Sequence, residues 1–365
     1  MFLRRADGNL PTWHERFSSL ANNNKPRSFD ARGGLLFDAR LEEREMPLDP
    51  AIVAMLAKRQ PIAAEDVSIS EFRSYVRKVS TARGPLNVPL AAVVDRTIPG
   101  PGGALPIRIY TPPGQGPFPL LVYFHGGGWI VGDLDTQDSI CRGLCVAVGC
   151  MVVSVDYRLA PEHKFPAAHE DCYAATFWVA NNALKLGGDP LRIAVGGDSA
   201  GAVLAAGVAL RARDEDGPAL RGQLLIYGSM SYPSAMTPSM EEFADGPILT
   251  RASSLVCWNS YLTDPATEQH DPRVSPQRAS NHRGLPPAFI GTAECDPSRD
   301  GAEAYGHTLS SAGVKVEQHR YAGMCHGFYA WIGVVPQAQL AIDDAARWLR
   351  GQWHITATTP VAAHG

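Results

Sequence analysis

A serine between two glycines is the first feature of this sequence that could do chemistry. Ser199 stands in Gly197-Asp198-Ser199-Ala200-Gly201, after an apolar run that suits a strand and before an apolar run that suits a helix. Small neighbours permit a sharp strand-to-helix turn, which lifts the hydroxyl above a sheet and places it at a helix N-terminus. This context predicts a nucleophile. The alternative is a serine that only caps the helix.

Three consecutive glycines form the second feature. His125-Gly126-Gly127-Gly128-Trp129 follows the apolar run Leu120–Phe124, and its uncovered backbone N–H groups could point at an anion. A phosphate-binding loop would need Gly-x-Gly-x-x-Gly or a downstream Gly-Lys-Ser/Thr, and the sequence has neither. Beside a serine nucleophile, the glycines therefore predict an oxyanion hole, with His125 organising the loop rather than acting as a base.

A serine nucleophile needs a base, and the base needs an orienting group. Asp296 and His326 each follow an apolar run that suits a strand, so both would stand at carboxyl ends of strands, where open α/β sheets bind ligands. The chain order Ser199, Asp296, His326 is the order that α/β-hydrolases use. Asp300 is the rival orienting residue, although it falls one turn into a predicted helix.

Strands and helices that alternate along the chain would position these groups. Near-continuous apolar strands indicate a sheet that helices cover on both faces, and the alternation predicts a doubly wound, mostly parallel sheet. The strand-like runs are Ala91–Thr97, Pro106–Tyr110, Leu120–Phe124, Met151–Asp156, Arg192–Val195, Leu224–Tyr227, Ala288–Thr292 and Lys315–Arg320; the helix-like segments are Gln137–Val148, Ala167–Leu186, Ser199–Arg213, Arg299–Ala312 and Gln337–Gly351.

The first 85 residues suit helices rather than strands. Thr12-x-x-Glu15 is a capping-box pattern, so a short helix or a frayed arm is expected there, and Asp49-Pro50 and Ser68-x-x-Glu71 predict two further helix starts. A turn-rich stretch with a helix capped by Thr250 interrupts the alternation later. We therefore expect an N-terminal arm and cap helices at 1–85, a core at 86–228 and 278–351, a cap insertion at 229–277 and a tail at 352–365.

Composition excludes several classes of protein. The 365 residues carry 33 Lys and Arg against 37 Asp and Glu, a net charge of −4, which gives no basic surface for nucleic acid. The longest uncharged apolar run, Ser199–Leu210, is too short to span a membrane, and no secretory signal is expected.

Seven scattered cysteines without a Cys-x-x-Cys pair predict free thiols in a cytoplasmic protein. No metal or cofactor is expected, since the sequence has no His-x-x-x-His and no Cys/His cluster.

Taken together, these motifs resemble the hormone-sensitive-lipase-like family of α/β-hydrolase esterases. The resemblance runs from about residue 47 to 351, and this ordered combination of motifs is highly specific. It implies an α/β-hydrolase fold, with a mostly parallel eight-stranded sheet flanked by helices and a helical cap over the acyl and alcohol pockets. The matching stretches are His125–Trp129, Asp156–Glu162, Gly197–Gly201, Asp296–Asp300 and Gly323–Phe328.

For function, the resemblance implies a serine carboxylesterase that hydrolyses short to medium acyl esters through an acyl-enzyme. Its partner would be a small-molecule ester, with the chain a monomer or a homodimer. An amidase, lactonase or deacetylase could use the same groups, because pocket shape decides the leaving group. A non-catalytic receptor is disfavoured because the histidine is present. Carried over by position, the roles are Ser199 as nucleophile, His326 as base, Asp296 as orienting group, and the N–H groups of Gly127, Gly128 and Ala200 as oxyanion hole.

Some positions depart from the family's pattern. The family usually has leucine where Ser298 stands and an acidic residue at Gly301, and bulkier or apolar side chains are more common at Cys295 and Cys325. The first 45 residues have no clear counterpart. Because the two cysteines adjoin Asp296 and His326, they are expected to be buried small side chains, with reactive thiols as the alternative.

Overall fold

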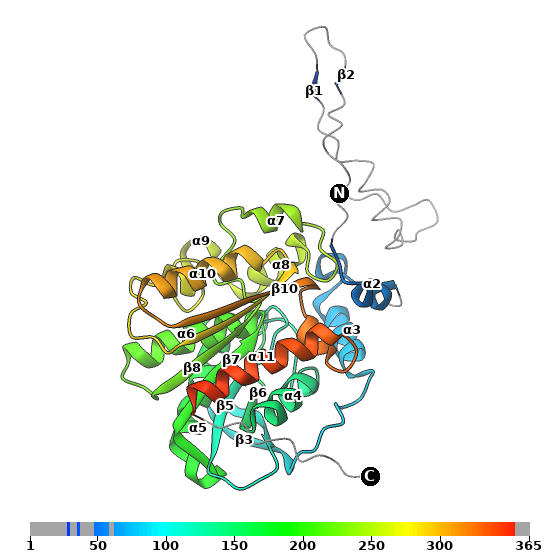
Figure 1. The fold of residues 1–365 in the computed structure, drawn as a ribbon. Helices are drawn as coiled ribbons and strands as arrows, with labels where there is room; N and C mark the ends of the chain where they lie inside the picture. Colours follow the sequence, from blue (N-terminus) through cyan, green and yellow to red (C-terminus); the bar gives the residue numbers. More distant parts are fainter. Residues whose placement is uncertain (1–27, 30–34, 37–46, 58–61, 355–365) are drawn as a thin grey trace, which may run out of the picture. The chain divides into compact units, whose positions relative to one another are not determined.

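The structure is a computed structural model that describes residues 28–29, 35–36, 47–57 and 62–354 (Figure 1). The chain divides into two compact units, residues 1–61 and 62–365. The proposed nucleophile, base and oxyanion loop all belong to the second unit.

An eight-stranded sheet lies at the centre of the second unit, in the strand order β10-β9-β8-β7-β5-β6-β4-β3 (Figure 1). The pairs from β10 to β6 run parallel, whereas β4 pairs antiparallel with both β6 and β3. All eight strands were predicted from the sequence. Their bounds are β3 Ala92–Gly100, β4 Gly103–Thr111, β5 Phe118–Phe124, β6 Met151–Val155, β7 Gly188–Asp198, β8 Leu220–Ile226, β9 Ala288–Cys295 and β10 Val316–Cys325.

Helices cover both faces of this sheet, as the apolar strands predict. α4 and α11 pack together on one face, and α5 and α6 pack together on the other (Figure 1). Nearly every residue of α6 is buried, which explains its unbroken apolar run as a core helix. The helices are α4 Asp138–Val148, α5 Ala167–Leu186, α6 Ala200–Asp214, α10 Arg299–Ser311 and α11 Pro336–Gln352, with the short η3 at Phe328–Trp331.

This unit has two further groups of helices. In the sequence, the first group comes before β3 and the second comes between β8 and β9. Ser68 forms the predicted capping box with Glu71 at the start of α3, and the Thr250 hydroxyl caps α8 by accepting the Ser253 N–H at 2.8 Å. The elements are η1 Ala64–Asp66, α3 Ile69–Thr81, α7 Pro238–Glu242, α8 Arg251–Tyr261, α9 Pro265–Glu268 and η2 Pro276–Arg278.

The first unit contains one described helix, α2 at Pro50–Ala57. As predicted, Asp49 precedes this helix, and its carboxylate accepts the Ala51 N–H at 2.8 Å. The expectation of a helical start without strands is wrong in one respect, because β1 (Ser28–Phe29) pairs antiparallel with β2 (Leu35–Leu36). The sequence between them holds two adjacent glycines, a composition typical of hairpin turns. The helix expected at Thr12–Glu15 lies outside the described residues.

No helix in the described ranges has the length and apolar character needed to cross a membrane.

Candidate active site

Ser199 occupies a strained turn between β7 and α6. Its backbone has φ 54° and ψ −119°, a conformation that a non-glycine residue adopts only when its surroundings hold it there. The flanking glycines are needed for space, since a Cβ at Gly201 would lie 1.9 Å from the carbonyl oxygen of Phe124, at the end of β5. The Ser199 hydroxyl makes no capping bond to α6. The structure therefore does not support the alternative that Ser199 only caps the helix.

His326 lies between Ser199 and Asp296 and forms hydrogen bonds with both. Its Nε2 is 2.9 Å from Ser199 Oγ, and its Nδ1 is 2.8 Å from Asp296 Oδ2. Because Asp296 is fully buried and can only accept when ionised, it favours the tautomer with the proton on Nδ1. Nε2 is then free to accept the proton of the Ser199 hydroxyl.

Asp300, the rival orienting residue, is engaged elsewhere. Its Oδ2 accepts the N–H of Ser239 at 2.8 Å, and its Oδ1 lies 2.9 Å from Nε of Arg299. These contacts place it between α7 and the start of α10. The structure thus brings together Ser199, His326 and Asp296 and leaves Asp300 in an ion pair.

The glycine-rich loop after β5 has an unusual backbone. Gly127 and Gly128 have φ of 116° and 59°, and Trp129 has φ 61°, which is uncommon for a residue with a side chain. A Cβ at Gly127 would lie 2.2 Å from the carbonyl oxygen of Val131, so the loop is too tight for any larger residue there. Within residues 62–354, the N–H groups of Gly127, Gly128 and Ala200 have no protein acceptor. They are available to an external acceptor.

His125 is part of this loop's support and is not placed to act as a base. Its ring is fully buried and stacks on Tyr157, with centroids 4.1 Å apart. Its Nδ1 lies 2.8 Å from the carbonyl oxygen of Gly126, while the Tyr157 hydroxyl donates to the His125 carbonyl at 2.7 Å. Burial lowers the pKa of His125 to about 4, so the ring is neutral near pH 7. This is the organising role that the sequence predicted.

Asp198 links the serine turn to the glycine-rich loop, a function that the sequence analysis missed. Its Oδ1 accepts the Tyr123 hydroxyl at 2.9 Å and the Gly126 N–H at 3.0 Å. Burial raises the pKa of Asp198 to about 6, against the opposing effect of these two donors. The signal that could have identified it is a carboxylate at the end of an otherwise apolar strand, where an acid needs buried donors.

Aromatic side chains of α8 cover the outer side of the glycine-rich loop. Trp129 stacks on Tyr261 with centroids 4.5 Å apart and contacts Trp258 at 4.3 Å. Cys257 is packed so closely on Gly128 that a Cβ at this glycine would lie 2.3 Å from the sulfur. The segment between β8 and β9 therefore contacts the loop directly.

The two cysteines that adjoin the site are fully buried. Cys295 and Cys325 have no exposed surface, and none of the seven cysteines forms a disulfide. Burial raises the pKa of Cys295 to about 12, so its thiolate is scarce near neutral pH. Both positions fit small buried side chains rather than reactive thiols.

Known proteins resemble this chain over most of its length. A family described as the alpha/beta hydrolase fold matches residues 121–330. Esterase LipI of Mycobacterium tuberculosis is 42% identical over 311 residues, which cover 84% of this chain and 96% of that protein. Carboxylesterase NlhH of the same species is 42% identical over 314 residues, covering 84% and 97% of the two chains.

A solved structure agrees with this assignment. An esterase from Pyrobaculum calidifontis superimposes with a TM-score of 0.79 at 38% sequence identity, covering 85% of this chain and all of that one. The chain therefore belongs to the hormone-sensitive-lipase-like family of α/β hydrolases and is a carboxylic ester hydrolase.

Proposed function

We propose that Ser199 is the nucleophile of this hydrolase, with His326 as general base and Asp296 as the group that orients it. The observation that carries this assignment is the position of His326, whose two ring nitrogens lie 2.9 Å from Ser199 Oγ and 2.8 Å from Asp296 Oδ2. Such a chain of hydrogen bonds lets a neutral imidazole accept a proton and lets the carboxylate stabilise the imidazolium that results.

The reaction proceeds in two halves. Ser199 Oγ forms a bond to the ester carbonyl carbon as its proton moves to Nε2 of His326. The tetrahedral intermediate then expels the alcohol, which takes that proton, and leaves an acyl-enzyme. Water adds to the acyl carbon with His326 again as base, and breakdown of the second intermediate returns the proton to Ser199 and releases the acid.

The N–H groups of Gly127, Gly128 and Ala200 stabilise the oxyanion of both intermediates. Three facts support this assignment. The groups have no acceptor in the part of the chain that the structure describes, two of them belong to the loop after β5, the strand that pairs with β7 before the serine turn, and the third begins α6. Fixed donors at a developing negative charge are typically the largest contribution to such catalysis, and removing one costs about 10²–10³-fold in kcat.

Residues 62–85, which precede β3 in the second unit, and residues 229–277 supply a cap over the acyl and alcohol pockets. Contacts among the described residues support this role for both segments. The Ala64 N–H donates to Ser253 Oγ at 3.2 Å and Thr250 donates to Glu65 at 2.9 Å, so η1 is fastened to α8. The aromatic face of α8 in turn packs on Trp129. The proposed cap therefore contacts the glycine-rich loop, whose Gly127 and Gly128 N–H groups are the proposed oxyanion donors.

The substrate is a short to medium acyl ester, taken by a cytoplasmic monomer or homodimer without a cofactor. The relatives named as esterases and carboxylesterases favour esters over amides and lactones. Seven cysteines, none of which forms a disulfide, suit a reducing compartment. Sedimentation velocity of the purified protein would determine the oligomeric state.

A labelling experiment tests the assignment of the nucleophile. A fluorophosphonate should label the protein with one equivalent, and peptide mass spectrometry should place the adduct on Ser199. A panel of p-nitrophenyl esters, matched anilides and lactones then separates the leaving-group classes, with esters of short to medium acyl chains expected to react fastest. Labelling at another residue, or full activity after complete modification, would overturn the assignment.

A further inference from the structure

The glycine-rich loop depends on neighbouring segments as well as on its own turn, in which the Gly127 carbonyl accepts the N–H groups of Ile130 at 3.1 Å and Val131 at 3.0 Å. Gly127, Gly128 and Trp129 all have left-handed φ values, and such a run persists only when neighbouring groups fix it. On the core side, Asp198 accepts the Gly126 N–H, and the Trp129 carbonyl accepts the Ala160 N–H at 2.9 Å. These bonds hold the loop's beginning, but they involve neither the Ile130 carbonyl nor the carboxylates of Asp133 and Asp135 farther along the loop.

Arg73 of α3 holds the middle of the loop. Its Nε donates to the Ile130 carbonyl at 2.7 Å, and its Nη2 donates to the Ala160 carbonyl at 2.8 Å. The same guanidinium pairs with Glu162 at 2.7 Å. One planar group therefore joins α3 to the glycine-rich loop and to the segment whose Ala160 N–H donates to the Trp129 carbonyl. A lysine, with a single ammonium, cannot reproduce this fork of donors.

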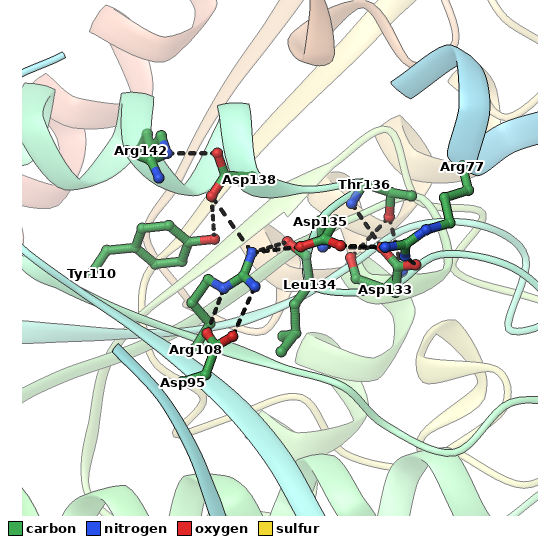
Figure 2. A network of polar contacts seen from close by, with 10 residues as sticks. All are labelled: Arg77, Asp95, Arg108, Tyr110, Asp133, Leu134, Asp135, Thr136, Asp138 and Arg142. Atoms are coloured by element: carbon green, nitrogen blue, oxygen red, sulfur yellow. Dashed lines mark hydrogen bonds and ion pairs between the residues drawn. The ribbon is translucent and has the colours of Figure 1, made fainter. Parts of the chain in front are cut away.

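Arg77 of α3 holds the end of the loop through two carboxylates. It pairs with both Asp133 and Asp135, and its side chain approaches them from α3 (Figure 2). Asp133 is itself part of the loop's fold, because its Oδ1 accepts the N–H groups of Asp135 at 3.0 Å and Thr136 at 2.8 Å. Arg77 therefore acts on a carboxylate that organises the turn.

Arg108 of β4 completes the support from the sheet. Its Nη1 lies 2.9 Å from Asp135, and its Nε and Nη2 contact Asp95 at 2.6 and 2.9 Å (Figure 2). Asp135 is thus held between Arg77 of a helix and Arg108 of a strand. A single exposed ion pair contributes little to stability, but a connected network of charges can fix a geometry. An open cleft of about 580 Å³ borders this network, so solvent reaches it.

The two arginines lie on one side of α3, because residues four apart follow each other along a helix face. Phe72 and Val76, each one position earlier, pack against the hydrophobic core. α3 has no fully buried residue, and the contacts of its arginines are therefore a substantial part of its attachment. The bonds of Arg73 and Arg77 therefore fix both α3 and the glycine-rich loop.

We propose that Arg73 and Arg77 are positioning residues for the oxyanion hole. They touch no reacting atom and act by fixing the loop that carries the Gly127 and Gly128 N–H groups, so this inference rests on the proposed function. A loop displaced by about 1 Å can cost on the order of 10²-fold in rate. Because the oxyanion exists only after Ser199 has attacked, the loss falls on kcat and spares substrate binding.

The test compares two charge-removing variants with matched controls. Arg73→Met should lower kcat about 10-fold or more and Arg77→Met about 3- to 10-fold, with KM within about twofold of wild type, as expected for partial loss of oxyanion stabilisation. Lys78→Met removes an exposed charge from the same helix, and Glu162→Gln removes the ion pair while leaving both carbonyl bonds of Arg73. Both controls should keep wild-type kcat.

A trifluoromethyl ketone supplies the second readout. Ser199 Oγ adds to its carbonyl carbon as the serine proton moves to His326, and the former ketone oxygen becomes an oxyanion in the same hole. Its inhibition constant should rise in each arginine variant by the factor that kcat/KM falls. Arg73→Lys and Arg77→Lys, which keep the charge and the fold, should recover part of the loss.

Two outcomes would overturn the proposal. One is wild-type kcat in both methionine variants. The other is a kcat loss that follows a lower melting temperature while the affinity for the trifluoromethyl ketone stays unchanged. If a methionine variant does not fold, the lysine variants carry the same comparison. Failure of the proposed function is distinguishable, because Ser199→Ala would then keep its activity whatever the arginine variants do.

Discussion

The hydroxyl of Ser298 lies 2.8 Å from Oδ1 of Asp296, the carboxylate whose other oxygen contacts His326 at 2.8 Å. The Ser298 N–H reaches the same Oδ1, also at 2.8 Å. The hydroxyl has a second acceptor in the Tyr227 carbonyl, but this is farther away at 3.2 Å. The Asp296 carboxylate, which we propose orients His326, therefore has two donors on Oδ1 from Ser298, the backbone N–H and the side-chain hydroxyl.

Ser298→Ala should therefore lower both the stability of the protein and its turnover. Without the hydroxyl, the Asp296 carboxylate loses one of the donors that hold it in place. The free energy of unfolding should fall by about 1.5–3 kcal/mol, the usual loss of a hydrogen bond to a charged group. A carboxylate that is held less firmly should also orient the His326 ring less well, so kcat should fall with it. Urea unfolding and initial rates with a p-nitrophenyl ester measure the two effects. Ser298→Thr keeps the hydroxyl and serves as control; wild-type stability in Ser298→Ala would contradict the expectation.

Substitutions of the three proposed catalytic residues should differ in severity. Ser199→Ala and His326→Ala should each lower kcat by about 10⁶-fold, because they remove the nucleophile and its base. Asp296→Asn should cost about 10⁴-fold, since an amide can favour the wrong tautomer of His326. Initial rates with a p-nitrophenyl ester measure the difference, provided that the variants have the melting temperature of the wild type. Near-normal turnover by Ser199→Ala would refute the mechanism.

Asp156 should make the fold less stable above its pKa. Burial, with the nearby Asp133 and Asp135 carboxylates, raises the pKa of Asp156 to about 6 in the folded protein, against the opposing effect of Arg108 and Arg77. In the unfolded chain it returns to an ordinary value near 3.8. Between these values the folded state holds the proton more tightly, so this group's contribution is favourable at low pH and is lost as the pH rises through about 6.

The variant Asp156→Asn tests this sign. It should gain stability over wild type at pH 7.5 by about 1 to 3 kcal/mol, allowing for solvent screening of the partly exposed carboxyl, and gain less at pH 4.5. Urea unfolding at the two pH values measures the difference. An equal gain at both values would show that the substitution acts through something other than ionisation.

Two glycines near the site should respond in opposite ways to alanine. A Cβ at Gly201 would meet the Phe124 carbonyl oxygen at 1.9 Å, so Gly201→Ala must displace β5 or the serine turn. We expect loss of about 2 kcal/mol or more of stability, together with most of the activity. A Cβ at Gly301, in the first turn of α10, would have no neighbouring atom within 4 Å, so Gly301→Ala should stabilise the helix by about 0.5–1 kcal/mol. Thermal unfolding of both variants decides the comparison.

Local pattern in the sequence was enough to predict the strands of the large sheet and the helices that cover it, and to choose the residues proposed for the site. The runs at Leu120–Phe124 and Ala167–Leu186 predicted β5 and α5 because strand and helix periodicity depend on neighbouring residues alone. Ser199, Asp296 and His326 could be chosen by residue type, by chain order and by their positions at the ends of apolar strands. The hairpin of β1 and β2 was missed because pairs of two residues leave no period to detect.

The tertiary structure decided what holds the site in shape. Asp198 accepts a backbone N–H from a loop 72 positions away in the sequence. Arg73 donates to two backbone carbonyls that lie 57 and 87 positions away. The order of strands, with β4 antiparallel to β6, likewise depends on pairing between distant segments. No local period marks which charged residue will face which turn, since a solvated arginine and one that fixes a loop have the same sequence signature. Only the folded chain brings Asp198 and Arg73 within hydrogen-bonding distance of the backbone groups that they hold, and these bonds are what allow them to support the site.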